Sequence, residues 1–256
     1  MSTSSSTDFA GKVVVITGAG RGIGAAAARH FSTHAARTVL LNRPRSGRPA
    51  DADAPQAGLE LACDVSDPDS VAAALEVVAA RFGRVDVLVN NAGIIEPIAR
   101  LADSDPQHWS QAIATNLTGA YLVARGVIPL MSAAGGGTIV NISSGAASSA
   151  LEGWSHYCAS KAGLRALTAC LDLELRDSGI RAIGLSPGTV ATDMQVAIRS
   201  SGLNPVSRLA PSAHLAPEWV AKAIAWLCTS AADPYLGTDF SLKTEEGRRL
   251  TGLPPL

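Results

Sequence analysis

Tyr157 and Lys161 have residue types and a spacing that suggest chemistry, and Ser144 stands thirteen residues before the tyrosine. Residues four apart on a helix share a face, so the Lys161 ammonium can lie beside the Tyr157 phenol. A nearby positive charge favours the ionised form of a phenol, whose free pKa is about 10. The pair is therefore predicted to donate and accept a proton near neutral pH.

A second motif is the glycine-rich run 17–24, which follows an apolar stretch and is expected to open a helix at Ile23. Its glycines are Gly18, Gly22 and Gly24. Glycines let a backbone approach a pyrophosphate, whose charge is favoured by the N–H groups and dipole of a helix N-terminus. The run therefore indicates a nucleotide-binding turn, to which Arg21 adds positive charge. The alternative is a tight turn that only packs a helix on a sheet, because the spacing is Gly-x-x-x-Gly-x-Gly rather than Gly-x-Gly-x-x-Gly.

The end of the second expected strand, Asn42-Arg43, bears on the choice of cofactor. An acidic side chain there would hold the ribose of NAD and repel the phosphate of NADP. No carboxylate is present, and Arg43 can grip a phosphate through paired hydrogen bonds, so NADP(H) is favoured over NAD(H). Arg45 and Arg48 can add charge or lie in a solvated loop. Asp64 can accept from an adenine amine or serve as a turn residue.

Short apolar runs alternate with longer segments of helical period, which is the pattern of parallel strands joined by crossover helices. The sequence therefore predicts a single α/β domain over residues 1–256, a doubly wound, Rossmann-like, mostly parallel seven-stranded sheet with helices on both faces. The expected strands are Lys12–Thr17, Thr38–Asn42, Leu59–Val65, Val85–Asn90, Thr138–Ser143, Ile180–Ser186 and Thr238–Lys243.

The expected helices include residues 67–82, where Asp67 can act as the N-cap before Pro68. Longer helices are expected at 107–131 and 157–177, and a core helix at 219–227. Three prolines and two glycines in residues 43–58 predict a loop there. Residues 194–216 carry Ser, Gly and Pro without strong periodicity and are expected to form a mobile lid, and residues 1–10 are expected to be flexible.

Composition excludes several classes of function. The formal net charge is -1, so nothing calls for a nucleic-acid or anionic-membrane partner. No apolar run approaches the ~20 residues of a membrane span, and the N-terminus lacks an apolar signal region, so a cytoplasmic protein is expected. The four cysteines and five histidines show no metal-binding spacing, so no metal is predicted.

These motifs together resemble the short-chain dehydrogenase/reductase family, from about residue 11 to residue 242. The matching residues, in order, are Thr17 to Gly24, Asp64, Asn90-Asn91-Ala92-Gly93, Asn116, Ser144, Tyr157, Lys161 and Pro187-Gly188. The resemblance implies an oxidoreductase in which Tyr157 is the general acid/base and Lys161 lowers its pKa and contacts the nicotinamide ribose. It also implies that Ser144 orients the substrate carbonyl and that Asn116 holds a water of the proton relay. Without the resemblance, Asn116 could be a polar residue near the surface, and Ser144 a turn or cap residue.

The resemblance also implies a set of cofactor-binding residues. They are Gly18, Arg21, Gly22, Ile23, Gly24, Asn42, Arg43, Asp64, Val65, Asn91, Ala92, Gly93, Tyr157, Lys161, Pro187, Gly188, Val190 and Thr192. By analogy with relatives, a homodimer or homotetramer acting on a small carbonyl or alcohol is expected. The alternatives are a cofactor-binding regulatory protein without turnover and, within the family, a 3-oxoacyl-type reductase or an alcohol dehydrogenase. A serine hydrolase is excluded because Ser144 lacks the Gly-x-Ser-x-Gly elbow.

Residues 153–158, residues 192–199 and the tail resemble the branch of sepiapterin reductase and benzil reductase. That branch implies a neutral dicarbonyl or aromatic ketone as substrate. Apolar residues that either surround such a substrate or belong to the core are Ile94, Ile95, Leu151, Trp154, Val190 and Met194. His156 is interpreted as structural or solvated, and residues 243–249 as a solvated charged end.

Overall fold

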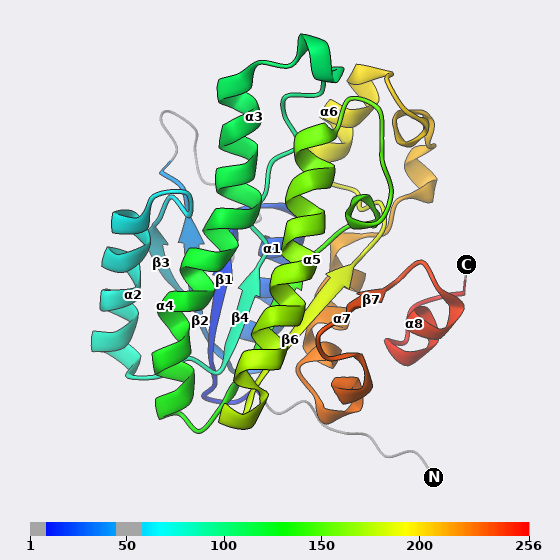
Figure 1. The fold of residues 1–256 in the computed structure, drawn as a ribbon. Helices are drawn as coiled ribbons and strands as arrows, with labels where there is room; N and C mark the ends of the chain where they lie inside the picture. The colour runs from blue at the N-terminus through cyan, green and yellow to red at the C-terminus, as the bar shows by residue number, and fades with distance from the viewer. Residues whose placement is uncertain (1–8, 45–57, 256) are drawn as a thin grey trace.

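The computed structural model describes residues 9–44 and 58–255. Seven parallel strands form one sheet in the order β3-β2-β1-β4-β5-β6-β7 (Figure 1). The strands are β1 (Val13–Thr17), β2 (Arg37–Asn42), β3 (Leu59–Ala62), β4 (Val87–Asn90), β5 (Gly137–Ile142), β6 (Ile180–Ser186) and β7 (Asp239–Ser241). Because all seven run in one direction, their carboxyl ends meet along one edge of the sheet. The expected doubly wound fold is confirmed, with every strand pair parallel.

Helices cover both faces of the sheet, and alternate residues of the strands point to opposite faces. Val14 and Ile16 of β1 pack with one core that includes α1 and α7, while Val13 and Val15 pack with the other core, which includes α2 and α4. In Figure 1, α4 and α5 lie in front of the sheet and α1 lies behind it. The helices are α1 (Gly22–Thr33), α2 (Pro68–Phe82), α3 (Pro106–Ile113), α4 (Gly119–Ala133), α5 (Ser155–Leu175), α6 (Asp193–Ser201), α7 (Pro217–Leu227) and α8 (Glu245–Leu250).

Local signals account for several helix ends. Asp67 caps α2 as predicted, because its carboxylate accepts a hydrogen bond from the Asp69 N–H at 3.0 Å. Helix α2 ends where Gly83 adopts a positive φ of 65°. Thr244 caps the short α8 in the same manner, because its hydroxyl accepts from the Gly247 N–H at 3.0 Å. The tail that was expected to be a solvated end therefore begins with a capped helix.

The helix expected at 107–131 is interrupted. It consists of α3, a π-helical turn at Ala114–Thr118 and α4. A π turn holds one residue more than an α-helical turn and often occurs at functional sites. Since Asn116 lies in the middle of this turn, the interruption coincides with a candidate catalytic residue.

Residues 194–216 are also more regular than expected. Helix α6 begins at Asp193 and ends at Ser201, where Gly202 follows as the C-cap with a φ of 65°, and two 3₁₀ turns follow at Pro205–Arg208 and Pro211–Ala213. The predicted loop at 43–58 lies largely outside the described residues, as do residues 1–8 of the N-terminal segment. Phe9, near the end of that segment, is buried against Phe31 with the two rings edge to face.

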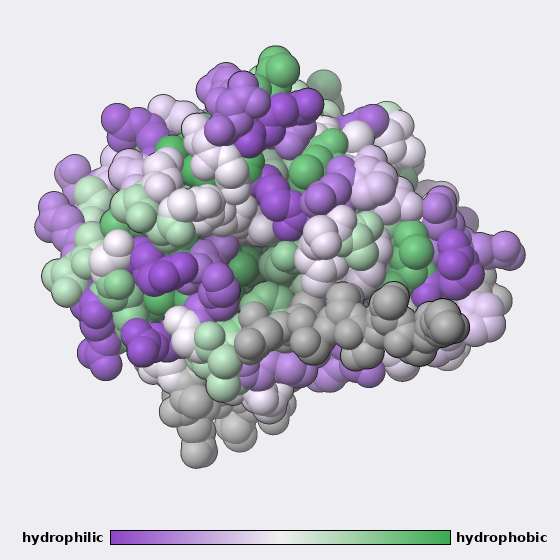
Figure 2. Space-filling view, turned by 90° about the horizontal axis from the view of Figure 1, so that it is seen from below, coloured by the Kyte–Doolittle hydropathy of each residue, from purple (hydrophilic) through white to green (hydrophobic). Residues whose placement is uncertain are grey.

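The opposite edge of the sheet holds a buried carboxylate, Asp86, between the amino ends of β1 and β4. It accepts hydrogen bonds from the Val13 N–H at 2.9 Å and from Arg84 and Lys12. These contacts hold the pKa of Asp86 below its usual value, although burial alone would raise it. Figure 2 shows the molecule from this side, where hydrophilic and hydrophobic residues are interspersed on the surface.

Candidate active site

A cavity of about 870 Å³ lies at the carboxyl ends of the strands. Loops that follow β1, β2, β3, β4, β5, β6 and β7 all contribute to its walls, together with α5 and α6. The parallel sheet explains this convergence, since a crevice at the carboxyl ends of strands is where open α/β sheets bind ligands. Of the predicted cofactor-binding residues, all except Gly24 line the cavity.

The glycine-rich turn requires its glycines for two different reasons. Gly18 and Gly22 have positive φ values of 63° and 54°, which side chains rarely adopt. Gly24 instead lies beneath the turn, where an added Cβ would come within 2.3 Å of the Gly18 carbonyl oxygen. The first two glycines therefore shape the cavity wall, and Gly24 allows α1 to pack closely against it.

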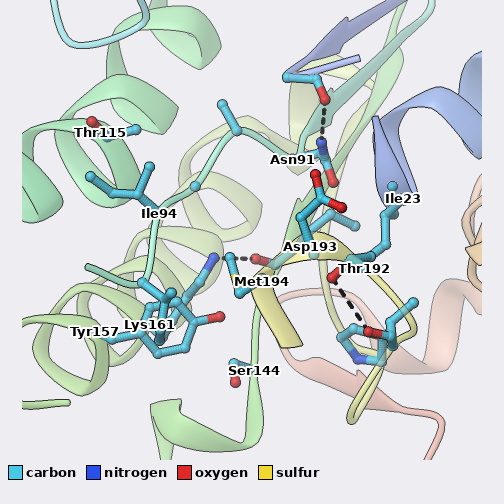
Figure 3. A pocket seen from close by; sticks show the side chains of 18 of the residues that line it. Ile23, Asn91, Ile94, Thr115, Ser144, Tyr157, Lys161, Thr192, Asp193 and Met194 are labelled. Atoms are coloured by element: carbon cyan, nitrogen blue, oxygen red, sulfur yellow. Dashed lines mark hydrogen bonds between the residues drawn. The ribbon is translucent and has the colours of Figure 1, made fainter. Parts of the chain in front are cut away.

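The glycine-rich turn is joined to the loop that follows β4. The Thr17 hydroxyl accepts hydrogen bonds from the N–H groups of Asn91 and Ala92 at 3.0 and 2.9 Å. The Asn91 amide in turn donates to the carbonyl oxygens of Thr17 and Gly18 at 2.9 and 3.0 Å (Figure 3). These contacts join two walls of the cavity into one unit.

At the end of β2, Arg43 lines the cavity, while the Asn42 amide donates to Glu60 on β3 at 2.8 Å. Arg45 and Arg48 lie outside the described residues. The Asp64 carboxylate accepts hydrogen bonds from the N–H and hydroxyl of Ser66 at 3.0 and 2.6 Å. These contacts fit the alternative of a turn residue, but Asp64 also lines the cavity, so its contact with an adenine amine stays a prediction.

Tyr157 and Lys161 lie side by side in the first turns of α5, with Ser144 near them (Figure 3). The Lys161 Nζ lies 5.6 Å from the centre of the Tyr157 ring and donates to the Ile142 carbonyl oxygen at 2.7 Å. Both side chains are buried. Ser144 follows β5, and its hydroxyl accepts from the Ala146 N–H at 3.2 Å. Three of the four predicted catalytic residues, Ser144, Tyr157 and Lys161, therefore line the same part of the cavity.

The pKa values of this group differ from the sequence-based expectation. Burial raises the pKa of Tyr157 to about 12, and a hydrogen bond with Ser144 opposes that rise only in part. Burial also lowers the pKa of Lys161 to about 8, against the opposing charge of Asp239. Desolvation therefore acts against the lowering of the Tyr157 pKa that was expected from the Lys161 charge. The role of Tyr157 as general acid/base stays a prediction.

Asn116 is almost fully buried in the π turn. Its Oδ1 accepts from the Ile94 N–H at 2.8 Å, and its Nδ2 donates to the Ile94 carbonyl oxygen at 2.9 Å and the Ser160 hydroxyl at 3.2 Å. Asn116 thus fastens the loop after β4 to the base of α5. It does not itself line the cavity, and its part in a proton relay stays a prediction.

The apolar wall of the cavity contains all six residues proposed from the sequence to surround a substrate. Ile95, Trp154 and Ile198 are buried in one cluster with Tyr157. Ile198 belongs to α6, so this helix closes the substrate side rather than lying apart from it. His156 is buried, with its Nε2 2.7 Å from the Ile95 carbonyl oxygen, which confirms a structural position.

Some lining residues were missed by sequence reasoning, among them Asp193, Thr115 and Lys243. Asp193 forms an ion pair with Arg21 at 2.9 Å, between the glycine-rich turn and α6. Lys243 packs its side chain over Gly188, where an added Cβ would come within 3.0 Å of its Cγ. The signal that could have found Lys243 is its place directly after the last strand, since parallel strands end at the same edge.

The fold and the site together define a nucleotide-binding α/β protein with a serine, a tyrosine and a lysine at the carboxyl ends of its strands. The sequence model of the family described as short chain dehydrogenase matches residues 12–202. The chain belongs to this family and is an NAD(P)-dependent oxidoreductase.

Two curated relatives match along most of the chain. A D-threitol dehydrogenase of Mycolicibacterium smegmatis is 39% identical over 240 residues, covering 90% of each chain. A cis-4-hydroxycyclohexanecarboxylate dehydrogenase of Sinomonas cyclohexanicum is 39% identical over 233 residues, covering 90% of this chain and 94% of the relative. Among solved structures, a 3-ketoacyl-(acyl-carrier-protein) reductase of Brucella melitensis complexed with NADH is 29% identical, with a TM-score of 0.78 over 91% of this chain and 97% of its own. The resemblance to the sepiapterin and benzil reductase branch stays a prediction.

Within the described residues, no helix is long and apolar enough to cross a membrane. The same residues contain no group of three or more His, Cys, Asp or Glu side chains placed to hold a metal ion.

Proposed function

We propose that this protein reduces a ketone or dicarbonyl to an alcohol with NADP(H), using Tyr157 as the proton donor. The observation that carries the proposal is the meeting of Ser144, Tyr157 and Lys161 in the cavity that the glycine-rich turn also lines. The names of the two curated relatives support it, because each denotes a dehydrogenase of a small hydroxylated molecule. The solved ketoacyl reductase is named for the reduction of a ketone, and this name supports the reductive direction of the proposed reaction.

The residues fit a dinucleotide. The glycine-rich turn offers backbone N–H groups at the start of α1, and the positive φ values of Gly18 and Gly22 keep side chains out of the approach. When bound, the reduced nicotinamide supplies a hydride to the carbonyl carbon. The Tyr157 hydroxyl gives its proton to the carbonyl oxygen, so C=O becomes CH–OH. Ser144 donates to the same oxygen as negative charge develops there. The Lys161 ammonium stabilises the phenolate that remains.

The test is the loss of reduced-nicotinamide absorbance on mixing the protein with NADPH and a panel of ketones and diketones. Tyr157→Phe removes only the hydroxyl and is expected to lower kcat by about 10²–10⁴-fold, the usual contribution of a general acid. Tyr121→Phe, at a partly exposed site on α4, is the matched control and keeps full activity. If NADPH binds tightly but is not consumed with any substrate, the protein is instead a cofactor-binding regulator.

The preference for NADP rests on Arg43, which lines the cavity at the end of β2. Charge-assisted hydrogen bonds contribute about 1.5–3 kcal/mol, so Arg43→Ala is expected to weaken NADPH binding about 10–100-fold and NADH binding far less. Arg37→Ala, at the other end of β2, serves as the control. Equal losses for both cofactors would refute this assignment.

We also propose that residues 194–216 act as a lid. Helix α6 carries Met194 and Ile198 into the apolar wall, so its displacement would open the substrate side. By analogy with relatives, we propose a homodimer or homotetramer in the cytoplasm.

A further inference from the structure

A partly buried carboxylate that the proposed reaction does not use, Asp239, lies on β7. The Oδ2 of Asp239 accepts a hydrogen bond from the Ser143 hydroxyl at 2.5 Å. Its Oδ1 is buried and has no hydrogen-bond partner within the described part of the chain. Because an unsatisfied buried carboxylate oxygen costs free energy, its position calls for a compensating charge nearby.

The register of the sheet shows which face Asp239 occupies. Asn141 of β5, Gly184 of β6 and Asp239 of β7 lie abreast, so their side-chain positions share one face. The Asn141 amide donates to the Thr168 hydroxyl at 2.9 Å, which identifies this face as the one under α5. Gly184 leaves the space that Asp239 fills, since an added Cβ would come within 1.9 Å of the carboxylate Oδ1.

Helix α5 places two cations over this carboxylate. Lys161, Arg165 and Thr168 are spaced four and three apart and therefore share a stripe of the helix. Arg165 is exposed, whereas Lys161 is buried and donates to the Ile142 carbonyl oxygen. Ile142 immediately precedes Ser143, so the Lys161 ammonium and the Asp239 carboxylate form hydrogen bonds with consecutive residues at the end of β5.

The electrostatic effects agree with this placement. Burial raises the pKa of Asp239, and the Ser143 hydrogen bond, Arg165 and Lys161 oppose that rise. Burial lowers the pKa of Lys161, and Asp239 opposes that fall. The groups facing the carboxylate are thus Lys161 and Arg165 from α5 and Ser143 directly after β5, while β6 contributes the bare Gly184.

We propose that Asp239 is a positioning residue of the catalytic group, whose carboxylate keeps the buried Lys161 protonated and holds the strand end that carries Ser144. The proposal rests on the proposed function only in the use made of Lys161. A charged ammonium beside Tyr157 favours the phenolate that proton donation leaves behind, so Asp239 acts on the chemistry through Lys161 without touching the substrate.

The chain has only four lysines, Lys12, Lys161, Lys222 and Lys243, so the titration of Lys161 can be observed directly. The experiment labels lysine Cε with ¹³C, assigns the Lys161 signal by its loss in Lys161→Arg, and follows each signal with pH. In Asp239→Asn, the midpoint of the Lys161 titration is expected to fall by about one pH unit, a tenfold loss of proton affinity. Asp233→Asn removes an equal charge from a surface ion pair with Arg181 and should leave the midpoint in place.

Two further variants keep the result interpretable. Ser143→Ala removes the hydrogen bond but keeps the carboxylate, so Lys161 should titrate nearly as in the wild type. If Asp239→Asn does not fold by circular dichroism, Asp239→Thr carries the same test. An unchanged Lys161 midpoint in the folded Asp239 variant overturns the proposal. Because this readout needs no substrate, a protein without turnover would refute the proposed function while leaving the Lys161 result intact.

Discussion

Replacing Asn116 by leucine should destabilise the protein, because the N–H and the carbonyl oxygen of Ile94 both lose their hydrogen-bond partner. The Asn116 amide pairs with the N–H and the carbonyl oxygen of Ile94, at 2.8 and 2.9 Å. Leaving a buried polar group unpaired costs about 1–3 kcal/mol, so two such groups together cost about 4 kcal/mol at the middle of the possible range. For a domain of this size each kcal/mol lowers Tm by about 2–4 °C, which gives a fall of about 8–16 °C.

The assay is thermal unfolding followed by circular dichroism, with Thr115→Val as the control. Thr115 occupies the same π turn and is buried, but its hydroxyl only accepts from Gln111 at 3.2 Å, so its loss orphans no main-chain group. Asn116→Asp should also lower Tm, but less than Asn116→Leu, because a carboxylate can still accept from the Ile94 N–H and cannot donate to the Ile94 carbonyl oxygen. A Tm of Asn116→Leu equal to that of Thr115→Val would refute the reasoning that the amide secures this loop.

Two other predictions concern pH. Since the pKa of Lys161 is about 8 and that of Tyr157 about 12, the rate of ketone reduction should be level at neutral pH and fall as pH rises through about 8, where the ammonium is lost. Initial rates across that range check this, and a rate that rises there would contradict it. The lowered pKa of Asp86 means that its ionised form stabilises the fold above its unfolded pKa, a contribution lost as pH falls through the folded value. Asp86→Asn should therefore cost about 1.5–3 kcal/mol in urea unfolding at neutral pH, as loss of hydrogen bonds to a charged group does, and the difference from the wild type should close in acid. A gap that persists in acid would assign the effect to shape instead of charge.

The positions of most site residues could be predicted because the motifs directly follow strands. Gly18, Asn91, Ser144 and Gly188 each come at or just past the carboxyl end of a buried strand, and a parallel sheet brings such ends together. Local sequence therefore contained enough information to place them in one cavity. The expected strand ends were close for the same reason, although β3 stops at Ala62 rather than at Val65.

Properties that depend on distant contacts could not be predicted in this way. The burial that raises the pKa of Tyr157 involves Ile95 and Ile198, which lie far from it in the sequence. The partners of Asn116 lie 22 residues away in the loop after β4. Contacts between residues so far apart in the sequence cannot be predicted from residue spacing.

Helix α6 is a different case, because local signals were present. Asp193 stands in its first turn and Gly202 follows its last residue, as helix starts and stops require. The segment was nevertheless predicted to be a mobile lid, because its Ser, Gly and Pro residues are typical of loops. The π turn in turn escapes prediction because the apolar period of the surrounding helices continues through it.

The hydrogen bonds among Thr17, Gly18, Asn91 and Ala92 bear on how the walls of the cavity respond to a ligand. They join the turn after β1 to the loop after β4, so one side of the cavity is assembled in advance. A dinucleotide settling there loses little conformational freedom of the protein, whereas the carbonyl compound meets the side formed partly by α6. One wall of the cavity is thus expected to change little when a ligand enters, whereas the shape of the opposite wall depends on where α6 lies.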